Sequence, residues 1–162
     1  MIVVFRIDDR LLHGQVARSW TKQYNIEKIV IINDEVMNDE FSKMTLRLAK
    51  PQEVDLIFSD KGNSEELLKR MEISEDRVMC IVNGFEDAMI VLPFLPKVKK
   101  INIGGLRSKS RDSNIVINPS VVLTNKDKEL VEKLLNDGYI LEIRQVPGER
   151  PYFLEKGNYD GN

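Results

Sequence analysis

The chain contains a single histidine, His13, which lies among charged residues in the segment 8–14 (DDRLLHG). An ordinary imidazole has a pKa of about 6.5, so near pH 7 it is mostly neutral and offers one nucleophilic nitrogen. The planar guanidinium of Arg10, three residues earlier, can bind two oxygens of a phosphoryl group and stays charged. His13 and Arg10 together predict phosphoryl transfer through a histidine nucleophile.

The residues that follow His13 are expected to start a helix. The first backbone N–H groups of a helix have no partner within it, and they favour anions. We therefore predict that the amides of Gly14, Gln15 and Val16 bind the phosphoryl oxygens. Gly14 also allows a phosphate or another backbone to approach closely, because it has no Cβ.

The two carboxylates before Arg10 have two alternative roles. Asp8 or Asp9 could accept an N–H from the ring of His13 or hold Arg10 in place. Alternatively, one of them caps the turn by accepting hydrogen bonds from backbone N–H groups. The sequence does not separate these roles.

The elements that must position these residues are read from runs of Val, Ile, Leu and Phe that alternate with amphipathic segments. The predicted strands are Ile2–Ile7, Lys28–Asn33, Val54–Ser59, Arg77–Val82, Lys100–Gly104, Asn114–Ile117 and Ile140–Val146. The predicted helices are Gln15–Lys22, Asp39–Lys50 with a cap at Asn38, Ser64–Met71, Glu86–Leu95 with Pro93 as an earlier possible end, and Thr124–Asn136.

This alternation predicts an α/β fold, doubly wound, with a mainly parallel central sheet and helices on both faces. In such folds ligands bind beyond the carboxyl ends of the strands, which is where segment 8–16 begins. We expect one domain over residues 1–162, with a polar, loosely packed tail from about residue 147.

Composition and charge exclude several classes of protein. With 24 basic and 26 acidic side chains and a net charge of −2, the chain lacks the basic excess of a nucleic-acid binder. Its one cysteine, Cys80, lies in an apolar run and is expected to be a buried hydrophobic residue. Neither a signal peptide nor a membrane span is found, so a cytoplasmic protein is expected.

The segment 6–17 (RIDDRLLHGQVA), followed by Trp20, resembles the opening of mannose-type (mannose/fructose/sorbose) phosphotransferase-system IIB subunits. The resemblance continues through 28–36 (KIVIINDEV), 77–79, 101–106 (INIGGL) and 141–146, and so covers nearly the whole chain.

The resemblance implies an α/β fold with the phosphorylated histidine on the first strand–helix loop, at His13, and with Arg10 beside it. It implies a phosphoryl donor, the phosphohistidine of a IIA protein or domain, and a sugar acceptor held by membrane IIC and IID subunits. It implies no metal and no organic cofactor in this step. The protein would be cytoplasmic and transiently at the inner face of the membrane.

The resemblance leaves some features open. The sugar is not specified, and a homodimer is an alternative to a monomer because related systems often assemble in pairs. The loop after Gly105 is more basic than in some relatives, with Arg107, Lys109 and Arg111. These charges either steer an acidic rim of IIA toward the site or belong to a solvated loop.

A receiver-like regulatory domain phosphorylated on aspartate is the alternative reading. Asp8, Asp9 and Asp60 could imitate its acidic Mg²⁺ pocket, but no lysine follows the strand at residues 101–106 as that design requires. A nucleotide-binding module is more remote, because neither a GxxxxGK[ST] loop nor a GxGxxG motif after a strand occurs.

Overall fold

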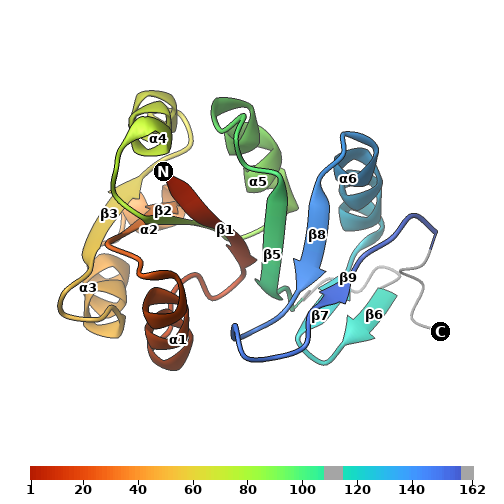
Figure 1. The fold of residues 1–162 in the computed structure, drawn as a ribbon, viewed down its shortest axis with the longest axis horizontal. Helices are drawn as coiled ribbons and strands as arrows, with labels where there is room; N and C mark the ends of the chain where they lie inside the picture. Colours follow the sequence, from red (N-terminus) through yellow and green to blue (C-terminus); the bar gives the residue numbers. More distant parts are fainter. Residues whose placement is uncertain (108–114, 158–162) are drawn as a thin grey trace.

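The computed structural model describes residues 1–107 and 115–157. A seven-stranded sheet runs through the molecule in the order β3-β2-β4-β1-β5-β8-β9 (Figure 1). Neighbouring strands are parallel except for β8 and β9. The strands are β1 (Ile2–Asp8), β2 (Lys28–Ile32), β3 (Asp55–Ser59), β4 (Val78–Val82), β5 (Lys100–Gly105), β8 (Ile140–Ile143) and β9 (Tyr152–Phe153). The predicted α/β fold with a mainly parallel sheet is confirmed.

Helices cover both faces of this sheet, as predicted. One face carries α1 (Gly14–Tyr24), the short α2 (Asp34–Met37) and α3 (Glu40–Ala49). The other carries α4 (Ser64–Ile73), α5 (Phe85–Val91) and α6 (Asn125–Asn136). Alternate side chains of a central strand therefore enter two different cores. In β4, Cys80 packs under α4 and α5, whereas Met79 and Ile81 pack under α1.

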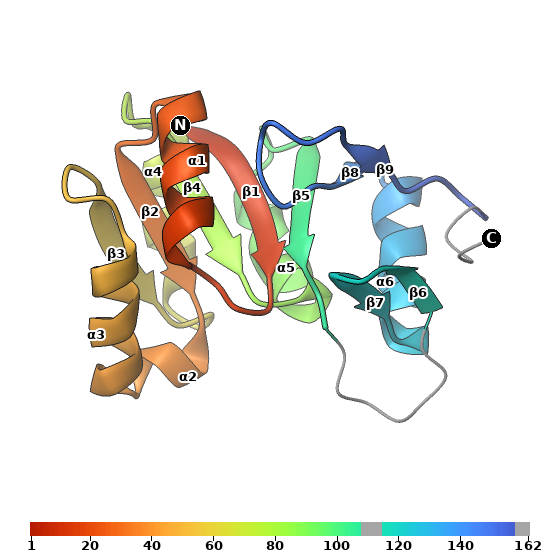
Figure 2. The ribbon, with the colours of Figure 1, turned by 90° about the horizontal axis from the view of Figure 1, so that it is seen from below.

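The order of the strands makes the carboxyl end of β1 a topological switch point. The chain leaves β1 through α1 toward β2, and it leaves its neighbour β5 in the opposite direction toward β8. In folds of this kind, ligands bind where connections diverge from adjacent parallel strands at the carboxyl edge. Figure 2 shows the ends of β1 and β5 at this edge, together with the start of α1.

Several helix ends differ from the predicted ones by one or more residues, and two of these differences have a clear structural cause. Asp39, and not Asn38, caps α3, because its carboxylate accepts the N–H of Phe41 at 3.1 Å. Asn38 instead ends α2, where its side-chain amide donates to the carbonyl of Asp34. Helix α5 ends at Val91, and a 3-10 turn at Leu92–Phe94 accommodates the proline that made this end uncertain.

The strand predicted at Asn114–Ile117 does not join the central sheet. The structure has β6 (Ile115–Asn118) paired antiparallel with β7 (Val121–Leu123) in a separate hairpin. The side chain of Asn118 accepts the N–H groups of Ser120 and Val121, which closes the turn between them. A hairpin needs only this short turn, whereas parallel pairing would need a long crossover.

The segment expected to be a loose tail contributes to the sheet. Strand β9 pairs with β8, with Tyr152 opposite Ile143 and Phe153 opposite Glu142. Leu154 follows it into the core and is almost fully buried. This part of the chain is therefore anchored at the edge of the domain.

Candidate functional site

The loop between β1 and α1 is held by two buried leucines. Leu11 has a left-handed backbone with φ of 58°, a conformation that leucine rarely adopts. Its N–H donates to the carbonyl of Asp8 at 2.9 Å, and both Leu11 and Leu12 are buried against α1 and β2. Burial of these two side chains compensates for the strained turn and leaves Arg10 and His13 on the outer side.

His13 is the residue at which α1 begins. Its backbone is extended, and its side chain makes no capping bond to the helix. The ring is directed back across the loop, with Nε2 3.4 Å from Oδ2 of Asp8 and 3.2 Å from Nη2 of Arg10. The side chain remains 27% exposed, so a second molecule can reach it. The predicted proximity of Arg10 and His13 is present.

The two contacts of Nε2 require opposite protonation states. A carboxylate only accepts hydrogen bonds and a guanidinium only donates them. Asp8 is fixed and fully buried, whereas Arg10 is exposed and can turn away into solvent. An unprotonated Nε2 would place its lone pair against the buried carboxylate, so the favoured tautomer carries the proton on Nε2. The lone pair of His13 then resides on Nδ1.

Asp8 lies at the last position of β1 and combines both roles left open by the sequence. Its Oδ1 accepts the backbone N–H of Arg10 at 3.0 Å, and its Oδ2 faces the ring of His13. Oδ2 also accepts Nη2 of Arg6 at 2.8 Å. Burial by itself would raise the pKa of Asp8, but the hydrogen bond from His13, the charge of Arg6 and the N–H of Arg10 hold that pKa below its usual value.

The start of α1 presents free amides beside the ring. The first hydrogen bond of the helix joins the N–H of Ala17 to the carbonyl of His13 at 2.9 Å. The amides of Gly14, Gln15 and Val16 precede this bond and have no acceptor within the helix. A Cβ on Gly14 would meet no atom within 4 Å, so the position next to the first amide on the side of the missing side chain is open.

Asp9 does not contact His13. It lies toward β5, where its carboxylate accepts both the backbone N–H of Arg107 at 2.6 Å and the Nη1 of that residue at 2.7 Å. The N–H of Asp9 donates to the carbonyl of Gly105 at 2.9 Å. Asp9 therefore joins the two loops at the carboxyl edge. Of the predicted basic loop, Arg107 is paired with Asp9, and Lys109 and Arg111 lie outside the described residues.

Arg6 and its partner Asn102 were missed in the sequence. Arg6 is a fully buried charge within β1, and it contacts Asp8, Asn102 and the backbone at Gly104. The signal was a charged residue at a position where its neighbours in the strand are apolar. Such a side chain must have a buried partner, because an unpaired buried charge is too costly.

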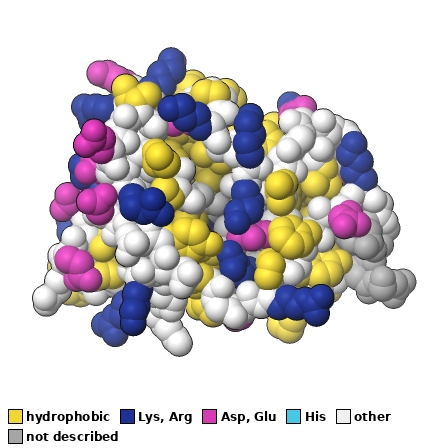
Figure 3. All heavy atoms as spheres, viewed as in Figure 1, with side chains coloured by type: hydrophobic (Ala, Val, Ile, Leu, Met, Phe, Trp, Pro, Cys, Tyr) yellow, Lys and Arg dark blue, Asp and Glu magenta, His cyan; other side chains and the backbone are white. Residues whose placement is uncertain are grey.

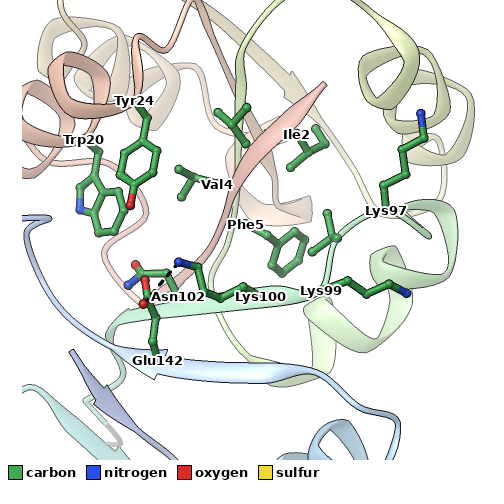
Figure 4. Close-up of a pocket in the computed structure, with 12 residues that line it drawn as sticks. Ile2, Val4, Phe5, Trp20, Tyr24, Lys97, Lys99, Lys100, Asn102 and Glu142 are labelled. Atoms are coloured by element: carbon green, nitrogen blue, oxygen red, sulfur yellow. Dashed lines mark ion pairs between the residues drawn. The ribbon is translucent and has the colours of Figure 1, made fainter.

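A cavity of about 250 Å³ lies elsewhere, between α1, the first half of β1, and strands β5 and β8. Figure 3, in the view of Figure 1, shows Lys and Arg side chains around a hollow on this face of the molecule. Figure 4 shows Trp20 and Tyr24 on one side of this cavity, with Asn102 and the ion pair of Lys100 and Glu142 on another. None of the predicted site residues lines it.

A histidine on the first strand–helix loop of a doubly wound sheet, with a buried carboxylate behind it and free amides beside it, defines a domain suited to carrying a phosphoryl group. The comparison with known families agrees. The chain belongs to the family described as the PTS system sorbose subfamily IIB component, whose model matches residues 2–156. It is thus a phosphotransferase component of a sugar-uptake system, as the resemblance of segment 6–17 implied.

Individual relatives support the assignment. A probable phosphotransferase enzyme IIB component of Streptococcus pyogenes is 32% identical over 139 residues, which is 84% of this chain and 85% of that one. The mannose-specific EIIAB component of Escherichia coli K12 is 32% identical over 146 residues, 90% of this chain and 45% of the longer relative. The chain thus spans less than half of that protein.

Solved structures share the fold. The IIBSor domain of the sorbose permease from Klebsiella pneumoniae superimposes with a TM-score of 0.83 at 27% identity, over 94% of this chain and 92% of that one. The manxB structure from Thermoanaerobacter tengcongensis superimposes with a TM-score of 0.84 at 27% identity, over 94% of this chain and 92% of that one.

Within the described ranges 1–107 and 115–157, no helix is long and apolar enough to cross a membrane.

The receiver-like alternative is not supported. Asp60 follows β3, which is separated from β1 by β2 and β4, so it cannot form one acidic pocket with Asp8. Asp60 instead accepts hydrogen bonds from Asn63, and Asp9 accepts a hydrogen bond from the backbone N–H of Arg107. Asp8, Asp9 and Asp60, the carboxylates that suggested this reading, therefore have separate partners in three different parts of the fold.

Proposed function

We propose that this chain accepts a phosphoryl group on Nδ1 of His13 from a phosphohistidine of a IIA protein or domain and passes it to a sugar bound by membrane IIC and IID subunits. The observation that carries the proposal is the placement of Nε2 of His13 against the buried carboxylate of Asp8. This placement leaves Nδ1 as the nucleophilic nitrogen. The chain acts in the cytoplasm and reaches the inner face of the membrane only when it delivers the group.

The first transfer balances without an external acid or base. The lone pair of Nδ1 forms a bond to phosphorus as the phosphorus–nitrogen bond of the donor breaks, and the donor leaves as a neutral imidazole. His13 then carries a phosphoryl group on Nδ1 and a proton on Nε2, and its ring becomes cationic. Asp8 stabilises that charge because its carboxylate faces Nε2 and is ionised.

The groups beside the loop of His13 can bind the oxygens of a phosphoryl group on Nδ1. Arg10 reaches the ring from the solvent side, and its guanidinium can grip two oxygens. The amides of Gly14, Gln15 and Val16 add donors at the positive end of the helix dipole. In the second transfer a sugar hydroxyl oxygen bonds to phosphorus as the bond to Nδ1 breaks. The electron pair of that bond returns to Nδ1, the ring becomes neutral with its proton still on Nε2, and the hydroxyl proton passes to water.

Labelling by a phosphorylated IIA protein tests the proposal. We expect one phosphoryl group per chain, on His13, with a bond that is lost in acid and survives in base. The His13→Ala variant should keep the circular dichroism spectrum of the native chain and take up no label. Label retained by this variant, or an adduct that is lost in base, would overturn the assignment.

A further inference from the structure

We propose that Arg6 is a positioning residue that acts through Asp8 to decide which ring nitrogen of His13 carries the proton, and therefore which nitrogen receives the phosphoryl group. The second half of this inference rests on the proposed function. The first half concerns the protein without phosphate and is tested separately. Arg6 does not touch His13 in the structure, so its effect must pass through the carboxylate.

The first step in the argument is the orientation of Asp8. Arg6 approaches the same oxygen that faces His13, with Nη2 at 2.8 Å and Nε at 3.3 Å from Oδ2. Both side chains are completely buried. A guanidinium that stays charged keeps this carboxylate ionised and holds Oδ2 at one position. Ionised Asp8 can only accept, so it selects the His13 tautomer with a proton on Nε2.

The second step is that Arg6 itself cannot turn. Its remaining terminal nitrogen, Nη1, donates to the side-chain oxygen of Asn102 and to the carbonyl of Arg144 at 3.3 Å. The amide of Asn102 donates to the same carbonyl at 3.1 Å. The planar fork is thus fixed to β1, to β5 and to the residue that follows β8. A lysine could not make these contacts together, because it presents a single point charge.

The third step is the space in which the guanidinium lies. A Cβ placed on Gly104 would be 1.9 Å from Nη2 and 2.0 Å from Cζ of Arg6. The guanidinium therefore occupies the volume that any other residue at position 104 would fill. It also lies 5.4 Å from the centre of the Trp20 ring, which is at cation–π distance. Gly104 and Trp20 have no contact with the reacting atoms, yet both define where Arg6 can be.

Displacement of Arg6 would change the protonation state of Asp8 and thereby the direction of its hydrogen bond with the ring of His13. Without the guanidinium, a carboxyl group buried this deeply favours its protonated form. A protonated carboxyl can donate to Nε2, which reverses the hydrogen bond and moves the ring proton to Nδ1. The nitrogen with the lone pair would then be Nε2, on the side of the ring that faces Asp8 and away from an incoming phosphoryl group.

Nitrogen NMR of the full chain measures this directly, because His13 is the only histidine. Long-range ¹H–¹⁵N spectra at about pH 8.5, where an ordinary imidazole is neutral, report the ratio of the two tautomers. The test variants are Arg6→Lys and Gly104→Ala, the second of which displaces the guanidinium while leaving every charge in the chain. Gly148→Ala is the matched control, because a Cβ there meets nothing within 4 Å.

We expect the native chain and Gly148→Ala to be mainly protonated on Nε2. In Gly104→Ala and Arg6→Lys the ratio of the Nε2-protonated tautomer to the Nδ1-protonated tautomer should fall by about tenfold or more, since a charge-assisted hydrogen bond is lost. An unchanged ratio in either variant, with a native dichroism spectrum, would reduce Arg6 to a buried structural charge. If Arg6→Lys does not fold, Gly104→Ala decides, and Gly105→Ala, next to Arg107 instead, should leave the ratio native.

Phosphorylation then tests the second half. With a phosphorylated IIA protein, the native chain should give the Nδ1 isomer, and the variants should be labelled more slowly and give a detectable share of the Nε2 isomer. Native-like isomer content in Gly104→Ala would overturn the link to the reaction. If the native chain takes up no label at all, the proposed function fails, whereas the tautomer result still judges the role of Arg6.

Discussion

Arg10 combines a fixed backbone with a free side chain. Its N–H is bound by Asp8, while its guanidinium is exposed and lies 3.2 Å from Nε2 of His13. Since Nε2 carries the proton in the favoured tautomer, both groups are donors and this contact is not a hydrogen bond. Among residues 1–107 and 115–157 the guanidinium of Arg10 has no anionic partner, and in the proposed reaction an arriving phosphoryl group would supply one.

Removal of Arg10 should therefore slow transfer much more than it affects folding. We expect Arg10→Ala to lower the rate of phosphoryl transfer from IIA by about 10²–10³, the usual cost of one charged contact at a transition state. Arg10→Lys should recover only part of the rate, because a point charge cannot bind two oxygens in a fork. Quenched-flow labelling and thermal melts measure both properties. A native transfer rate in Arg10→Ala would make Arg10 an ordinary surface residue.

Asp8 links the site to stability through its depressed pKa. Its favourable contribution is complete above the unfolded-state pKa of about 3.9 and is lost as the pH falls through the lower folded-state pKa. Asp8→Asn should cost about 3–5 kcal/mol at pH 7, because it leaves the charge of Arg6 buried without a counter-charge. Urea unfolding should show that the difference in the free energy of unfolding between the native chain and the variant becomes smaller below about pH 4. A gap that is constant with pH would contradict this account.

At this scale the sequence indicated the residues for which we propose the reaction, but not the residues that support them. His13, Arg10 and the choice between Asp8 and Asp9 could be read from one short segment. The resolution of that choice depends on Arg6, two residues before Asp8, and on Asn102 and Gly104 from a strand almost a hundred residues later. Only pairing of β1 with β5, with Arg6 opposite Asn102, brings them together.

Among the elements, α1 makes the most direct contribution to the site through its first turn. Gly14 is the first helical residue, and His13 before it already has the extended backbone that a following proline requires. Proline at the first position of a helix keeps the helix and removes one N–H. This position therefore allows a single donor to be deleted without changing a side chain of the site.

We expect Gly14→Pro to fold with a native dichroism spectrum and to transfer phosphoryl groups about 10²-fold more slowly than Gly14→Ala, which keeps the N–H. Alanine is the appropriate reference because a Cβ at this position meets no atom. Steady-state labelling with IIA compares the two variants. Equal rates would show that the amide of Gly14 does not contact the phosphoryl group.

The elements themselves were largely predictable, because strands buried on both faces read as continuous apolar runs. Elements with few residues were not: α2, β7 and β9 contain four, three and two residues. Segments this short carry no periodicity. Their positions are decided by partners elsewhere, as when Tyr152 pairs with Ile143.

For the whole molecule, the described part of the C-terminal segment completes the core under α6. Leu154 is 3% exposed and belongs to the same apolar cluster as Leu134 and Leu141. Leu154→Ala should lower the free energy of unfolding by about 2–4 kcal/mol through lost burial and a residual cavity. The exposed Phe153 offers a control, since Phe153→Ala should cost much less. Chemical denaturation measures both. Equal small losses would mean that this segment does not support the core.

Trp20 gives the molecule an optical property that follows from its position. It is the only tryptophan, it is 1% exposed, and its ring stacks on Tyr24 at 5.3 Å and lies beside the guanidiniums of Arg6 and Arg144. Its emission should therefore be that of a buried indole. Because Arg6 is bonded to the carboxylate that faces His13, a change of charge on the histidine alters the electric field at the indole. If His13 carries the phosphoryl group as proposed, the emission of Trp20 should report its loading and unloading in real time without an added dye.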